Sequence, residues 1–284
     1  MTLAQAILLG AVQGATEFIP ISSTAHLYLV QALLGLRNDS ITLAFDLVLH
    51  LGTVLALILA TRRELVAIVS ETFLWIGRRP PRDREARALI LPVLVGTVPG
   101  VLAGLLLLKK FESLRTVGLI GLSMIVACVY FLFAEAVGRR RNGAAEKSLD
   151  RLDLADAIAI GTAQAAAGLM AGFSRSGFTI STGRVRGLSR EDAARFSFLL
   201  ALPIILGAGA KAVLDLARHP EPPIPVAALA AGFLASAAVG YAAVRFLLAY
   251  LKTRTLRPFA IYLGILGASL LVWSLTRGLP ILGG

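Results

Sequence analysis

A polar stretch interrupts the first apolar segment of the chain, between residues 13 and 26. It reads Gln-Gly-Ala-Thr-Glu-Phe-Ile-Pro-Ile-Ser-Ser-Thr-Ala-His, and apolar arms at 3–12 and 27–36 flank it. Each arm is roughly half the ~20 residues that a helix needs to cross a bilayer. Backbone opened at membrane depth must be packed in protein or line a wet cavity, because unpaired peptide groups are costly in lipid. The stretch therefore predicts either a broken helix pair that carries a site or a proline-kinked spanning helix.

Composition places the chain in a membrane. It is 57% hydrophobic and 16% charged, with a mean hydropathy of +0.78, above ordinary soluble domains. The net charge of +11 lies in short connectors without aromatic interleaving, which argues against nucleic-acid binding. We interpret it as an orientation signal, with acidic head groups as a second possibility. The single cysteine, Cys128, excludes an internal disulfide, and no signal peptide is expected because no basic segment precedes the first apolar run.

Six longer apolar segments predict full membrane spans: residues 41–60, 89–108, 116–137, 191–213, 225–249 and 258–276. Basic connectors are expected at 61–88, around a short amphipathic piece, and at 139–151. A tight turn with Lys109, Lys110 and Arg115 should join the second and third spans. Residues 155–187 form a second interrupted segment, with a polar break from Ala171 to Gly177. We predict an all-α polytopic protein with one membrane domain over 1–284.

The order of these segments predicts a duplication. Each half, approximately 1–137 and 155–276, holds a re-entrant helix pair and three spans, and an odd number of spans inverts the second half. At an offset of 151 residues, identical residues include Gly10 and Gly161, Gln13 and Gln164, and Ser23 and Ser174. Apolar matches also recur but are weaker support in a membrane protein. Inverted repeats with broken helices typically place a site near the midplane where the repeats meet.

Loop charge predicts the orientation. The side that carries the two basic connectors receives eighteen Lys and Arg residues, and the opposite side receives seven. Because positive loops stay in the cytoplasm, both termini should lie outside. The first broken pair should then enter from outside and the second from inside.

Together the two breaks hold an unusual set of polar residues: Gln13, Glu17, Ser22, Ser23, Thr24 and His26, with Ser174, Arg175 and Ser176. An arginine at membrane depth needs a partner, and Glu17 is the obvious internal one. The pair could be structural, pinning the repeats together. Alternatively, hydroxyls, a guanidinium fork and helix N-termini form an anion cradle suited to phosphate.

Ser23 and His26 are three residues apart, which places hydroxyl and imidazole on one helix face. That spacing suits a nucleophile and its base, although a capping serine and a packed histidine are the ordinary alternative. Glu17 could orient His26 or hold a divalent cation. Asp46 and His50, one turn apart in the first full span, could line a pocket; we expect them to bond to each other instead.

Two motifs resemble the signatures of the bacterial undecaprenyl-diphosphate phosphatase family, the bacitracin-resistance type. They are Gln13-Gly-Ala-Thr-Glu-Phe-Ile-Pro-Ile-Ser-Ser-Thr-Ala-His26 and Gly172-Phe-Ser-Arg-Ser-Gly-Phe-Thr-Ile180, and Phe196-Ser-Phe-Leu-Leu-Ala-Leu-Pro203 extends the match. The resemblance implies interlocked inverted repeats in the plasma membrane. It implies removal of one phosphate from undecaprenyl diphosphate at the outer face, which recycles the lipid carrier of cell-wall synthesis. It also implies a divalent cation, Mg²⁺ or Ca²⁺.

Carried over residue by residue, the resemblance implies Ser23 as nucleophile, His26 as its base, Glu17 as an essential acid and tentative metal ligand, and Arg175 as phosphate clamp. Thr24 and Ser174 would be supporting hydroxyls, with Ser22, Ser176 and Gln13 nearby in the binding site. His26 as the nucleophile is a variant of this scheme. Two departures stand out: Gln13 occupies a position where many members have Glu, and Ala171 replaces a common proline.

Two other classes of function compete with a phosphatase. A lipid flippase or anion transporter would use the same inverted-repeat architecture, but the two breaks carry different reactive groups, which favours chemistry. A structural scaffold would give the arginine and histidine no purpose. The expected partners are a polyprenyl diphosphate and membrane lipids, without nucleic acid. The sequence leaves the oligomeric state open, with a homodimer as one candidate.

Overall fold

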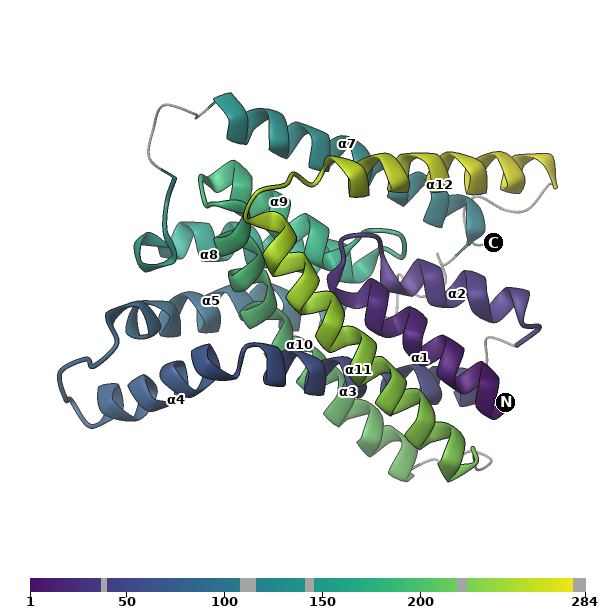
Figure 1. Cartoon of the computed structure of the whole chain (residues 1–284), viewed down its shortest axis with the longest axis horizontal. Helices are drawn as coiled ribbons and strands as arrows, with labels where there is room; N and C mark the ends of the chain where they lie inside the picture. The colour runs from purple at the N-terminus through teal and green to yellow at the C-terminus, as the bar shows by residue number, and fades with distance from the viewer. Residues whose placement is uncertain (37–39, 108–115, 141–145, 219–223, 278–284) are drawn as a thin grey trace.

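The computed structural model describes residues 1–36, 40–107, 116–140, 146–218 and 224–277, except the side chains at 40–41, 211–213 and 215–218. Within these residues the chain forms eleven α-helices and one short 3₁₀ helix, with no strand beyond an isolated bridge between Lys147 and Leu188 (Figure 1). Six of the helices are long and apolar enough to cross a membrane. The all-α, multi-pass prediction is therefore confirmed.

Both interrupted segments form broken helix pairs. Helix α1 (Leu3–Phe18) ends before Pro20, and α2 (Ser23–Leu33) returns beside it towards the same end of the molecule (Figure 1). Helix α8 (Leu154–Leu169) is followed by α9 (Arg175–Arg186), whose last residue pairs with Asp156 in the first turn of α8. A single kinked helix in place of the first pair is excluded. The second break lies at 170–174, earlier than predicted, because Ser174 caps α9 and makes Arg175 its first residue.

Four of the six candidate spans have bounds within three residues of the predicted ones: α3 (Ser40–Ala60), α7 (Val117–Arg140), α11 (Val226–Leu251) and α12 (Arg257–Thr276). A fifth, α10 (Arg190–Arg218), begins next to its predicted start but ends beyond the predicted end at 213. The sixth, α5 (Arg84–Leu106), begins several residues before the expected start at 89, because Asp83 caps it. The predicted turn with Lys109, Lys110 and Arg115 lies outside the described residues.

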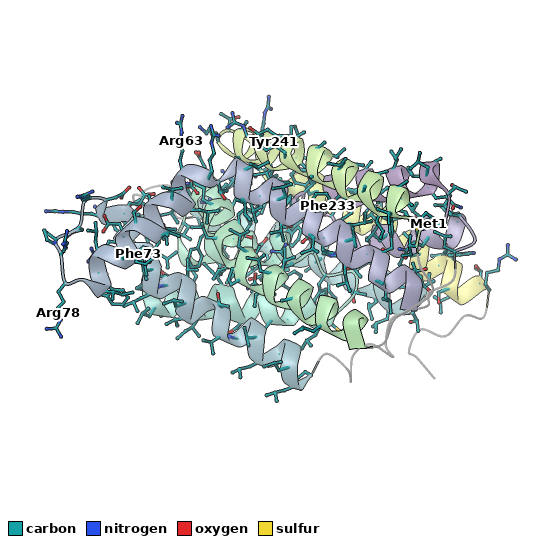
Figure 2. All side chains as sticks on the ribbon, turned by 90° about the horizontal axis from the view of Figure 1, so that it is seen from below. Met1, Arg63, Phe73, Arg78, Phe233 and Tyr241 are labelled. Carbon is teal, nitrogen blue, oxygen red and sulfur yellow. The ribbon has the colours of Figure 1, made fainter. Side chains whose placement is uncertain are left out.

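The first basic connector is mostly helical. Helix α4 (Arg62–Ile76) packs on the start of α5, and the carboxylate of Glu71 accepts hydrogen bonds from the backbone N–H groups of Arg82 and Asp83 and from the Arg87 side chain. Figure 2 shows Phe73 and Arg78 at the opposite end of the molecule from Met1. The predicted amphipathic piece is therefore α4, and this end carries the arginine-rich turn.

The helix pairs are held by close backbone contacts at glycines. Helix α1 packs along α11, where a Cβ built on Gly10 would lie 2.3 Å from the Gly232 carbonyl oxygen. Helix α8 packs along α5, where a Cβ on Gly161 would lie 2.1 Å from the Gly96 oxygen. Neither position admits a side chain without moving backbone. These glycines bring each broken pair against a full-length helix. They thereby fix the position of the tip of each pair, which is the turn between its two helices together with the adjoining helix ends.

Candidate active site

The tips of the two broken pairs meet at a cavity of about 230 Å³. Side chains from α1, α2, α3, α8, α9 and α10 and from the second break surround it. Its polar lining consists of Glu17, Ser23, Thr24, His50, Ser174 and Arg175. Its apolar lining includes Leu47, Met170, Phe173, Ile204 and Ile205. The structure therefore brings most of the predicted site residues together in one chamber with a largely apolar wall.

Glu17 is the centre of the polar contacts. Its Oε1 accepts a hydrogen bond from Arg175 Nη2 at 2.6 Å, which joins the two breaks across 158 positions of sequence. Its Oε2 accepts from Gln13 Nε2 at 2.9 Å and from Ser23 Oγ at 2.7 Å. The side chain is only 5% exposed. The predicted contact between Glu17 and Arg175 is confirmed, and the buried carboxylate is held by charge-assisted hydrogen bonds.

The two terminal nitrogens of the Arg175 guanidinium differ in their hydrogen bonding. Nη2 binds Glu17, whereas Nη1 is buried and has no hydrogen-bond partner among the residues that the structure describes. A buried donor without a partner costs about 1–3 kcal/mol, and arginine presents its donors in a fork that matches phosphate. Because Arg175 is also the first residue of α9, the positive end of that helix adds to its field.

The serines around the breaks take different roles. Ser174 Oγ accepts a hydrogen bond from the Gly177 N–H at 3.2 Å and lies 3.2 Å from Ser176 Oγ, so both serines stabilise the start of α9. Ser176 does not line the cavity. Ser22 precedes α2 with a φ of 72°, in the left-handed region, and its buried hydroxyl has no partner among the described residues. A serine held in that region is strained by about 1–3 kcal/mol, and the turn brings Ser23 towards Glu17.

The predicted pairing of Ser23 with His26 is wrong. Ser23 Oγ donates to Glu17 instead, and both ring nitrogens of His26 are engaged elsewhere. Nδ1 donates to the Ser22 carbonyl oxygen at 2.8 Å, and Nε2 accepts from the Tyr262 hydroxyl of α12 at 2.7 Å. The His26 and Tyr262 rings are stacked with centroids 5.7 Å apart. The ordinary alternative, a packed polar histidine, describes His26 better, and Tyr262 could not be identified from sequence spacing.

The expectation that Asp46 and His50 bond only to each other is also wrong. His50 Nδ1 donates to the Asp46 backbone oxygen at 2.7 Å, but the Asp46 side chain accepts from Gln31 Nε2 at 2.6 Å. His50 lines the cavity, with Nε2 3.7 Å from Glu17 Oε2. The i, i+4 spacing had indicated a shared face. It did not indicate that α3 turns this face towards the broken pairs.

The cavity offers few ligands for the expected cation. No cluster of three or more His, Cys, Asp and Glu side chains occurs among the residues described. Glu17 is the only carboxylate among the described residues of the lining, and His50, Ser23 and Thr24 supply the other donors. Mg²⁺ is commonly held by one or two carboxylates together with substrate phosphates. The residues therefore fit a divalent cation only when phosphate oxygens complete its coordination.

Comparison with known proteins identifies the family. The family model for the bacitracin resistance protein BacA matches residues 6–269. An undecaprenyl-diphosphatase of Rubrobacter xylanophilus is 42% identical over 92% of this chain and 94% of its own length. Proteins with the same name from Alcanivorax borkumensis and Geobacter sulfurreducens are 40% and 39% identical, covering 95% and 98% of this chain and 98% and 100% of their own. The chain therefore belongs to the bacitracin resistance protein BacA family.

Proposed function

We propose that this protein hydrolyses undecaprenyl diphosphate to undecaprenyl phosphate and inorganic phosphate. The relatives named undecaprenyl-diphosphatase align over nearly the whole chain. The observation that carries the proposal is the Arg175 guanidinium beside the cavity that Ser23 lines. Its Nη2 binds Glu17, and its buried Nη1 has no partner within the described part of the chain. An unpaired donor of this shape is ready for a phosphate oxygen.

The cavity wall suggests how the substrate lies. Its polar groups gather where the two breaks meet, whereas Leu47, Ile204 and Ile205 extend the lining along α3 and α10. The diphosphate therefore binds at Arg175, and the prenyl tail extends from it along the apolar residues of the cavity lining. The N–H groups at the start of α9 supply further donors for the terminal phosphate.

In the proposed reaction Ser23 Oγ attacks the terminal phosphorus while its proton passes to Glu17 Oε2, to which it is already hydrogen-bonded. The anhydride P–O bond breaks, and undecaprenyl phosphate leaves. Arg175 stabilises the charge on the phosphoryl oxygens. Water then attacks the phosphoserine, the P–O bond to Ser23 breaks, and the proton on Glu17 returns to Ser23 Oγ. Thr24 and Ser174 are supporting hydroxyls in the lining of the same cavity.

A divalent cation, Mg²⁺ or Ca²⁺ by resemblance, would be held by Glu17 and the phosphate oxygens. Bound there, it would neutralise phosphate charge and hold the leaving group.

We further propose a duplicated membrane architecture: two inverted repeats, about 1–137 and 155–276, within one domain, each with a re-entrant pair. The 151-residue offset aligns Gly10 with Gly161, and both pack on a glycine carbonyl of a full-length helix. The excess of Lys and Arg in the connectors supports a plasma-membrane orientation with both termini outside. The site would then open outward, where the released lipid phosphate re-enters the cycle of peptidoglycan synthesis.

Phosphate release from undecaprenyl diphosphate by purified protein in detergent tests the proposal. We expect release by the wild type, loss on adding a chelator, and loss in Ser23→Ala. Acid quenching followed by mass spectrometry should locate a phosphate on Ser23. Phosphate on His26 would instead support that residue as nucleophile, and the absence of any adduct would support direct attack by water. A flippase or transporter without hydrolytic activity would release no phosphate, which would refute the proposal.

A further inference from the structure

His50 has two ring nitrogens in different surroundings. Nδ1 lies 2.7 Å from the Asp46 backbone oxygen, which can only accept, so Nδ1 carries a proton. In the neutral imidazole Nε2 then has a lone pair, and it lies 3.7 Å from Glu17 Oε2 in the cavity lining. That separation is longer than a hydrogen bond. A lone pair on His50 and a carboxylate oxygen, which also accepts hydrogen bonds from Gln13 Nε2 and Ser23 Oγ, thus face each other across a gap.

Such a gap suits a cation. Ligands that lie about 2.0–2.2 Å from a cation are about 2.8–3.1 Å from one another in octahedral coordination and about 3.3–3.6 Å in tetrahedral coordination, so the observed 3.7 Å separation is longer by about 0.1–0.9 Å and would close on binding. Histidines that bind metals almost always donate their other ring N–H to a carboxylate, a backbone carbonyl or water. The bond from His50 Nδ1 to the Asp46 oxygen is of this kind, and it fixes the ring with Nε2 towards Glu17.

His26 provides a contrast within the same chain. Its Nδ1 donates to a carbonyl oxygen four residues earlier, as that of His50 does. Its Nε2, however, already accepts a hydrogen bond from Tyr262 at 2.7 Å. The two histidines therefore share a tautomer and differ in what their second nitrogen meets. Of these two described histidines, only His50 directs a lone pair at a carboxylate that borders the cavity.

We propose that His50 is the second protein ligand, beside Glu17, of the divalent cation used in the reaction. This inference rests on the proposed function. On α1, Gln13 supplies an amide that donates to Glu17 Oε2 and so adds no carboxylate. The imidazole from α3 provides the missing donor, and diphosphate oxygens complete the coordination. Because imidazole is a poor ligand for Ca²⁺, this site should prefer Mn²⁺ to Ca²⁺.

Electron spin echo spectroscopy of bound Mn²⁺ tests the proposal directly, because it detects a nitrogen that is bonded to the metal. Purified protein in nitrogen-free buffer is loaded with MnCl₂, with and without inorganic diphosphate. We expect imidazole ¹⁴N modulation in the wild type, stronger with diphosphate. The modulation should vanish in His50→Gln, with Mn²⁺ affinity at least about tenfold weaker, and persist in His26→Gln.

Three results would overturn the proposal: no nitrogen modulation from wild-type protein, modulation that survives in His50→Gln, or no bound Mn²⁺ even with diphosphate. If His50→Gln misfolds, the double variant His26→Gln, His219→Gln is used instead, because it keeps His50 as the only histidine. Nitrogen modulation from this variant supports His50 as the ligand, and its absence refutes it. Phosphate release from undecaprenyl diphosphate is measured on the same samples. Phosphate release without nitrogen modulation refutes only the assignment of His50 as a ligand and leaves the proposed hydrolysis standing. Nitrogen modulation without phosphate release refutes the proposed hydrolysis.

A rescue experiment identifies the donor that His50 replaces. In the double variant Gln13→Glu, His50→Gln, a second carboxylate from α1 should restore Mn²⁺ binding without nitrogen modulation. Its preference should shift towards Mg²⁺ and Ca²⁺, which favour oxygen ligands. Failure of this variant to bind Mn²⁺ more tightly than His50→Gln would contradict a shared position for the two donors.

Discussion

The two broken helix pairs are alike in their arms and different at their tips. Gly10 in α1 and Gly161 in α8 both press against a glycine carbonyl of a full-length helix. At the tips, the first pair presents Glu17 and Ser23, whereas the second presents Arg175. Gln13 and Gln164, which are identical at the 151 offset, also differ in their partners. The Gln13 amide donates to Glu17, and the Gln164 amide donates to the Leu200 backbone oxygen.

The difference indicates how two similar helix pairs can support one asymmetric site. Close packing constrains the arms, because a side chain at either glycine would displace backbone. The tips enclose a cavity and are less constrained by packing. In the proposed site, one tip supplies an acid and a hydroxyl, and the other supplies a guanidinium and a helix N-terminus.

The serines that match at the 151 offset should give the largest contrast. Ser23→Ala removes the proposed nucleophile and should reduce phosphate release on the order of 10⁴- to 10⁶-fold. Ser174→Ala removes the cap of α9 and should cost about 1 kcal/mol of stability, with a much smaller loss of activity. Phosphate-release rates and thermal unfolding of both variants are the measurements. Equal losses of activity would show that the tips have not diverged as described.

Arg175 should show a large effect that depends on shape as well as charge. Arg175→Ala removes the preorganised donors and should cost at least about 10²- to 10³-fold in turnover. Arg175→Lys keeps the charge but loses the fork that binds Glu17 and phosphate together, so it should recover only part of the rate. Turnover with undecaprenyl diphosphate, on samples that elute as folded protein, is the test. Near-normal turnover of Arg175→Ala would remove the second tip from the site.

The arms should respond in stability and only indirectly in chemistry. Gly161→Ala places a methyl group against the Gly96 carbonyl and should destabilise the protein by about 1–3 kcal/mol. Gly104→Ala is the matched control on α5, because a Cβ there would meet no atom within 4 Å. Thermal unfolding of the two variants in the same detergent decides the point. A control that is as unstable as Gly161→Ala would contradict the packing account.

Helix α4 lies between α3 and α5 in the sequence. Substitutions in it should have the smallest effect on activity. Backbone N–H groups of Asp83 and Arg82, with the Arg87 side chain, hold the pKa of Glu71 below its ordinary value. A lowered pKa means that this stabilisation is complete above the unfolded pKa, about 4–4.5. This stabilisation is lost as the pH falls through the pKa that Glu71 has in the folded protein.

Hydrogen exchange of the α4–α5 turn across this pH range checks the prediction. After correction for intrinsic rates, the wild type should lose protection as the pH falls. Glu71→Gln should show weak protection at every pH while releasing phosphate at the wild-type rate. If Glu71→Gln loses activity strongly, this end of the molecule is coupled to the site, contrary to the contrast between scaffold and tips.

The sequence predicted the parts of the fold that depend on local composition. Apolar length located the six candidate spans, and Pro20 with its polar neighbours located the first break. The meeting of Glu17 with Arg175 was predictable because a buried guanidinium needs an anion.

Contacts between distant segments were not predictable in this way. His26 meets Tyr262 from 236 residues away, and no local pattern points to that pair. The face shared by Asp46 and His50 was visible, but which helices it would contact depends on how α3 packs. The start of α9 depended on Ser174 acting as the cap, which moved Arg175 from the break onto the helix.

A double-mutant cycle on Glu17 and Arg175 tests most directly whether the two tips form one site. Phosphate release from undecaprenyl diphosphate is measured for the wild type, Glu17→Ala, Arg175→Ala and the double variant. Because each residue acts through the same substrate phosphate, the double variant should lose little more activity than the worse single variant. Losses that multiply as independent effects, or a single variant with wild-type turnover, would contradict a chamber shared by the two breaks.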